Sequence, residues 1–66
     1  MSYPKISLEA ARVNAGLTQS EAAKQLGIAK ETLGNYERGK TIPNWDTVQR
    51  ISELYNFPAD YILFSH

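Results

Sequence analysis

The stretch LTQSEAAKQLGIAKETLGNYERGK, residues 17–40, decides the fold of this chain. Thr18 and Glu21 have the Thr-x-x-Glu spacing of a capping box, in which each side chain binds the other residue's backbone N–H at the start of a helix. Gly27 is the residue type that most easily takes the left-handed conformation that ends a helix. The stretch therefore begins with a predicted helix over residues 19–26.

A second helix is predicted almost immediately after this turn. It covers residues 30–38, with Ile28 in the turn and Gly39 at its end. Its expected N-cap, Ala29, has no side-chain acceptor. Two helices separated by a glycine-containing turn of about 3–4 residues describe a helix-turn-helix, and the second helix of such a unit can lie in the major groove of DNA.

The segment before this unit predicts one helix preceded by a short arm. Residues 1–6 are expected to form a flexible arm, in which Tyr3 and Lys5 could touch DNA or a partner. Ser7 is a suitable N-cap for a helix over residues 8–15.

The segment after the unit predicts two more helices. Asn44 can cap the first, which covers residues 45–55 and carries a broad apolar stripe. A proline suits the first turn of a short fifth helix over about residues 58–64. The aromatic residues of this segment are interpreted as core residues: Trp45, Tyr55 and Phe57. The chain is thus expected to be one all-α domain of five helices over residues 7–64.

Composition narrows the class of protein. The chain has 66 residues and no cysteine, which excludes disulfides and thiolate metal sites and favours a reducing, cytoplasmic location. It has neither a run of about 18 apolar residues nor the plan of a signal peptide, so no membrane association is predicted. Seven basic residues balance seven acidic ones, but residues 1–40 carry a net +2 and residues 41–66 a net −2. The first part could therefore face phosphates.

The residues together resemble a known family, the Cro/repressor-type helix-turn-helix domains of the XRE family of bacterial and phage regulators. The resemblance covers about residues 6–64. It is carried by Arg12, Gly16-Leu17-Thr18-Gln19, Ala23, Gly27-Ile28, Leu33, Tyr36-Glu37-Arg38-Gly39-Lys40, Pro43 and Asp60-Tyr61-Ile62-Leu63. It implies a five-helix, lambda-repressor-like fold, dimeric binding to palindromic DNA operators, and a third helix that reads the bases.

The resemblance also implies which side chains contact DNA. Lys30, Glu31 and Asn35 match the positions that face base edges. Asparagine suits a bidentate pair with adenine, lysine suits guanine acceptors, and glutamate suits the cytosine amino group. The positions that match phosphate contacts are Gln19, Arg38, Lys40 and Thr41, which orient the domain more than they specify sequence.

For three residues on the predicted helices, a structural or neutral role is weighed against a role in DNA contact. Gly34 lies on the same face as the predicted contacts, and a glycine inside a helix costs about 1 kcal/mol relative to alanine. It is interpreted as permitting close approach of a DNA backbone or thymine methyl, the alternative being a neutral surface substitution. Arg12 and Glu37 resemble the family's buried ion pair, which is expected to have a scaffold role.

The last residues of the chain are more apolar than one small core needs. Tyr61, Leu63 and Phe64 are therefore predicted to form a homodimer interface, although they could instead fold back inside.

These features bear on three classes of function. The leading hypothesis is a sequence-specific binder of double-stranded DNA that regulates transcription, most simply as a repressor. The alternative is an antitoxin or other protein-interaction module with the same fold. An enzyme is disfavoured because His66 is the only histidine and no glycine-rich phosphate loop occurs. No metal or cofactor is predicted.

Overall fold

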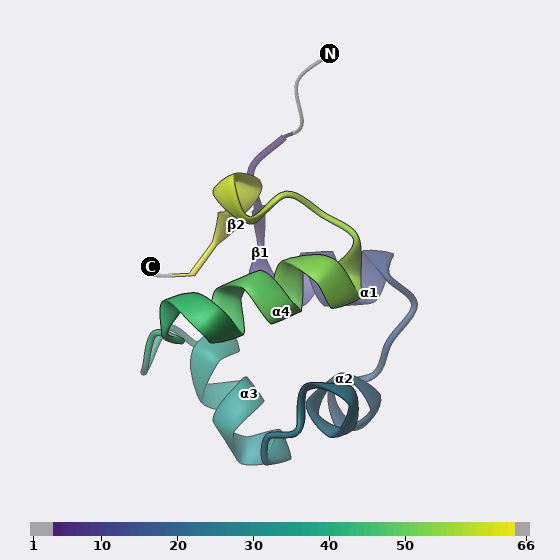
Figure 1. Ribbon diagram of the computed structural model, residues 1–66, viewed down its shortest axis with the longest axis vertical. Helices are drawn as coiled ribbons and strands as arrows, with labels where there is room; N and C mark the ends of the chain where they lie inside the picture. The colour runs from purple at the N-terminus through teal and green to yellow at the C-terminus, as the bar shows by residue number, and fades with distance from the viewer. Residues whose placement is uncertain (1–3, 65–66) are drawn as a thin grey trace.

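The computed structural model describes residues 4–64, so Tyr3 of the predicted arm and His66 lie outside the described residues. Within residues 4–64, four α-helices are followed by one turn of 3₁₀ helix, and two short strands pair near the two ends (Figure 1). In chain order the elements are β1 (Ile6–Ser7), α1 (Leu8–Asn14), α2 (Gln19–Leu26), α3 (Lys30–Glu37), α4 (Trp45–Tyr55), the 3₁₀ turn η1 (Ala59–Tyr61) and β2 (Ile62–Leu63). None of the helices among these residues is long and apolar enough to cross a membrane.

α2 and α3 form the predicted helix-turn-helix. Thr18 Oγ1 accepts a hydrogen bond from Glu21 N at 3.1 Å, and Glu21 Oε1 accepts one from Thr18 N at 2.8 Å, so the capping box is complete. The hydrogen bond from the Thr18 backbone lowers the pKa of the Glu21 carboxyl, because it favours the charged form. Gly27 then ends α2 with a φ of 72°, which lets the chain turn directly into α3.

α3 begins at the predicted residue and ends one residue earlier than expected. Ala29 occupies the N-cap without a side-chain hydrogen bond, because a methyl group cannot accept one. Arg38 is the C-cap, and its backbone N–H donates to Gly34 O at 3.0 Å. Gly39 follows with a φ of 74° and leads the chain away from the helix.

The core lies where α1, α2, α3 and α4 meet. Leu33 of α3 and Ile51 of α4 are fully buried, and two small residues of α2, Ala22 and Ala23, are buried beside them. The small side chains of these alanines let α3 lie close to α2. The buried apolar residues are Leu8, Ala11, Ala22, Ala23, Leu26, Leu33, Ile51, Tyr55 and Ile62.

The prediction that Trp45 is a core residue was wrong. Its side chain is 73% exposed, and it stands outside the set of residues that pack on the core. The reason is that α4 contributes to the core through its second half, with Ile51, Leu54 and Tyr55, whereas Trp45 is the first residue of the helix. Phe57 packs against the core as predicted.

The predicted fifth helix over residues 58–64 was also wrong. After η1 the chain becomes extended, and β2 pairs in parallel with β1, with Ile6 opposite Ile62 and Ser7 opposite Leu63. Ile62 is buried and Leu63 exposed, the alternation of a strand with one face on the core. The strand forms because the backbone N–H and C=O groups of β1 need hydrogen-bond partners. A helix over residues 58–64 would use its own backbone groups internally and could not supply them. Ile6 therefore belongs to the sheet and not to a flexible arm.

Candidate nucleic-acid interface

The outward side of α3 is left open by the rest of the chain in residues 4–64. Lys30, Glu31 and Arg38 are exposed, Asn35 is half-buried and Gly34 is buried. The atoms nearest to a Cβ at Gly34 would belong to the side chains of Gln19, in α2, and Arg38, the C-cap of α3. The predicted base-facing residues therefore share one accessible polar face.

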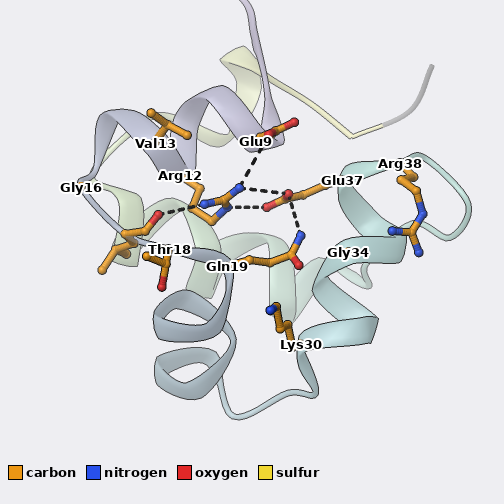
Figure 2. A pocket seen from close by; sticks show the side chains of 11 residues that line it. Glu9, Arg12, Val13, Gly16, Thr18, Gln19, Lys30, Gly34, Glu37 and Arg38 are labelled. Carbon is orange, nitrogen blue, oxygen red and sulfur yellow. Dashed lines mark hydrogen bonds and ion pairs between the residues drawn. The ribbon is translucent and has the colours of Figure 1, made fainter.

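A groove of about 670 Å³ runs beside this face, between α1, the start of α2 and α3 (Figure 2). Three cations and two carboxylates contribute to its walls, so its charge is mixed. The lining residues are Glu9, Arg12, Val13, Gly16, Leu17, Thr18, Gln19, Lys30, Gly34, Glu37 and Arg38.

The predicted ion pair lies at one wall of this groove and joins α1 to the end of α3. Arg12 Nε donates to Glu37 Oε2 at 2.7 Å, and both side chains are buried, with 11% and 6% of their surface exposed. Arg12 also donates to the Leu17 carbonyl oxygen at 2.9 Å. The hydrogen bond with Glu37 raises the pKa of Arg12, so the arginine stays charged. The pair fixes α1, the α1–α2 connection and α3 relative to one another.

Gln19 belongs to the same network. Its Nε2 donates to Glu37 Oε1 at 3.0 Å, and its side chain lines the groove at the first residue of α2 (Figure 2). The predicted phosphate contact is thus held by the ion pair, and one N–H of the amide remains available. The first turn of α2 adds backbone N–H groups on the same side, which suit an anion.

Gly34 adjoins the side chains of both α2 and α3. A Cβ at Gly34 would lie 3.2 Å from Arg38 Nη1 and 3.6 Å from Gln19 Nε2. Arg38 Nη2 in turn donates to Asn35 Oδ1 at 2.6 Å. Gly34 is therefore not a neutral surface position, because its missing side chain leaves room for two polar groups of the chain itself.

The residues after α3 lie at one end of the same face. Lys40 and Thr41 are exposed, and their backbone N–H groups both donate to the Asn35 carbonyl oxygen, at 2.9 and 3.5 Å. These bonds hold the backbone of Lys40 and Thr41 against the C-terminal end of α3.

The predicted dimer residues divide into two kinds. Phe64 packs against the core and Tyr61 is half-buried, so both fold back in part, whereas Leu63 is 47% exposed. Sequence reasoning missed the exposure of three other apolar residues: Val13 in α1, and Ile42 and Trp45 in and just after the α3–α4 connection. The apolar surface of the domain is therefore distributed differently from the prediction.

Arg50 has a contact that local sequence signals do not reveal. From the middle of α4, its Nη2 donates to the Leu26 carbonyl oxygen at the end of α2. A cation at a helix C-terminus is favourable because the last carbonyl groups carry partial negative charge.

Also in α4, the Tyr55 hydroxyl is buried and has no hydrogen bond within residues 4–64.

No group of three or more histidine, cysteine, aspartate or glutamate side chains that could hold a metal ion occurs among the described residues.

The capped helix pair, its close crossing and its open second helix define a helix-turn-helix domain. The chain belongs to the helix-turn-helix family, whose family model matches residues 8–62. The family resemblance found in the sequence is therefore confirmed.

Several curated proteins are similar to this chain. The HTH-type transcriptional regulator ImmR of Bacillus subtilis (strain 168) is 48% identical over 56 residues, which cover 85% of this chain and 44% of that protein. The cryptic phage CTXphi transcriptional repressor RstR of Vibrio cholerae is 36% identical over 47 residues, 71% of this chain and 42% of that protein. The HTH-type transcriptional activator BcrR of Enterococcus faecalis is 30% identical over 56 residues, 85% of this chain and 28% of that protein. The chain thus spans less than half the length of these three relatives.

Proposed function

We propose that this chain binds double-stranded DNA sequence-specifically and regulates transcription, with α3 in the major groove. The observation that carries the proposal is the open polar face of α3 beside a groove that has cations and helix N–H groups along it. A major groove about 12 Å wide admits one α-helix, and a helix is read through the side chains on its outward face. The names of the relatives, all transcriptional regulators, agree with this.

The contacts divide by chemistry. Lys30 and Glu31 are exposed in the first turn of α3, where side chains reach base edges in helix-turn-helix complexes. Phosphates are contacted by two residues that line the groove and by two that follow α3, and these contacts set the orientation of the domain. These are Gln19, Arg38, Lys40 and Thr41.

The domain acts as a dimer on a palindromic operator. A dimer presents its two copies of α3 about 34–36 Å apart, in successive major grooves. The exposed Leu63 of β2 and the half-buried Tyr61 and Phe64 beside it supply the apolar contact. Occupied operators exclude polymerase, so the regulator is a repressor.

A second candidate, a protein-interaction module such as an antitoxin, is favoured by one observation. Ile42 and Trp45, which are close in sequence, are 64% and 73% exposed, and exposed apolar surface of this kind is a feature of protein-interaction sites. In this case the α3–α4 connection binds a partner protein, and co-purification with that partner distinguishes the two candidates.

The test is enrichment of bound duplexes from a random pool, followed by gel shifts on the enriched sequence. We expect a palindromic consensus and an affinity that falls as salt rises, by a logarithmic slope of about −0.9 per neutralised phosphate. Lys30→Ala should relax preference at single base pairs. Lys24→Ala, an exposed lysine on α2 away from the groove lining, serves as the control. Binding no tighter than that to a competitor of unrelated sequence at low salt would refute the proposal.

A further inference from the structure

Arg38 and Asn35 form a side-chain pair on the open face of α3. Arg38 Nη2 donates to the Asn35 side chain at 2.6 Å, across one turn of the helix. Arginine has only donors, so the atom that faces it must be the amide oxygen and not the amide nitrogen. The orientation of the Asn35 amide follows from this chemistry.

Gly34 provides the space for this arrangement. In Figure 2 the Arg38 side chain runs back along α3, the direction that helical side chains favour. A Cβ at residue 34 would lie 3.2 Å from Arg38 Nη1, which is closer than an ordinary van der Waals contact. An alanine Cβ at residue 34 would therefore push the guanidinium away by a few tenths of an ångström, which changes the geometry of its hydrogen bond to Asn35.

The pair determines which hydrogen-bonding groups face a ligand. Asn35 Oδ1 is occupied by a cation, so its Nδ2 group, with two donors, is the part that remains available. The other N–H groups of Arg38 and the ammonium of Lys30 are also donors. In the major groove guanine presents two acceptors, N7 and O6, whereas adenine pairs N7 with an amino donor that would have to bind Oδ1 beside the guanidinium.

We propose that Arg38 is a positioning residue, which orients Asn35 so that α3 reads guanine and not adenine, and that Gly34 makes this possible. The inference rests on the proposed DNA-binding function and goes beyond it, because it names the base. It also replaces the adenine contact that asparagine alone suggested.

The experiment uses the full chain and the duplex enriched from a random pool, with each half-site position changed to the other three base pairs. We expect one guanine whose replacement weakens binding by about tenfold or more. Asn35→Ala and Arg38→Ala should each remove that preference at the same base pair, and the double variant should lose no more than either alone. Arg38→Gln keeps a donor without the charge and should retain part of the preference.

Two variants separate this role from charge and from folding. Lys40→Ala removes the same charge from the same end of α3, and it should weaken all sequences alike while the guanine preference stays. Gly34→Ala should melt at an unchanged or higher temperature, because alanine favours the helix, and yet reduce the guanine preference.

The outcomes are distinct. The inference alone is overturned if Asn35→Ala relaxes an adenine, or if Arg38→Ala and Lys40→Ala change binding identically. If the wild-type chain enriches no sequence, the proposed function is overturned and the inference with it.

Discussion

The substitution Glu37→Gln tests how the ion pair supports the fold. Glu37 accepts the hydrogen bond from Arg12 Nε at 2.7 Å, and it also accepts one from Gln19 Nε2 at 3.0 Å. Glutamine has the same shape but only one acceptor oxygen, and its amide N–H₂ would face the donors of Arg12. The guanidinium would then be a buried cation without its charged partner.

The magnitude follows from what Arg12 retains. Breaking a buried pair on one side costs about 3–5 kcal/mol. Arg12 keeps its bond to the Leu17 carbonyl oxygen at 2.9 Å and lies 3.8 Å from the exposed Glu9 carboxylate, so the lower end, about 3 kcal/mol, applies here. A domain of this length has a total stability of roughly 3–10 kcal/mol. The variant should therefore lose at least about a third of it.

Urea and thermal unfolding followed by circular dichroism measure this loss. We expect the melting temperature to fall by about 12–24 °C. Glu31→Gln makes the same chemical change on the exposed face of α3 and should shift the free energy of unfolding by less than about 0.5 kcal/mol. The double variant Arg12→Met with Glu37→Leu removes both charges and should be more stable than Glu37→Gln. A loss below about 1 kcal/mol for Glu37→Gln would refute the reasoning.

Three further predictions concern single contacts. Burial raises the pKa of Tyr55 to about 12 from an ordinary 10.0, so between these values the native state keeps a proton that the unfolded chain loses. The free energy of unfolding should therefore hold below pH 10 and fall between pH 10 and 12, by about 3 kcal/mol at most. Urea unfolding across this pH range measures the fall. Tyr55→Phe should abolish this fall, and at neutral pH it should unfold no more easily, because the hydroxyl lacks a hydrogen bond within residues 4–64; a loss above about 1 kcal/mol contradicts this. Arg50→Ala should destabilise the domain by about 1 kcal/mol, because it removes a cation from the carbonyl end of α2, measured by urea unfolding against Lys5→Ala, an exposed lysine outside the helices. Thr18→Ala should cost about 1 kcal/mol by removing the cap of α2, and a melting temperature equal to that of wild type would count against the capping box.

The helix-turn-helix was predictable because its signals are local. Thr18 and Glu21 define a helix start within four residues, and Gly27 supplies a conformation that few other residues tolerate. The buried positions of α2 and α3 follow from helical periodicity. The ion pair of Arg12 and Glu37 came from the family resemblance, since nothing in either local sequence points to the other.

The errors arose where distant residues decide the structure. The segment around Ile62 has helical signals in its own sequence, but it becomes a strand because β1 lies beside it. Trp45 belongs to an apolar stripe, but its position at the first turn of α4 takes it beyond the core. Arg50 reaches the end of α2 from 24 residues away. The role of Gly34 was ambiguous for the same reason, because the groups that fill its space come from Gln19 and Arg38.

The parallel pairing of β1 with β2 has a practical consequence for binding measurements. It brings Ile6 next to Ile62, on the side of α1 and α4 that lies away from α2 and the start of α3 (Figure 1). A fluorophore or a surface anchor attached to β1 would therefore lie on the far side of the domain from the start of α3. The proposed dimer contact of Tyr61, Leu63 and Phe64 lies on and beside β2, so an anchor at β1 is preferable to one at β2. Unhindered association through that anchor would show that the reading helix remains unobstructed.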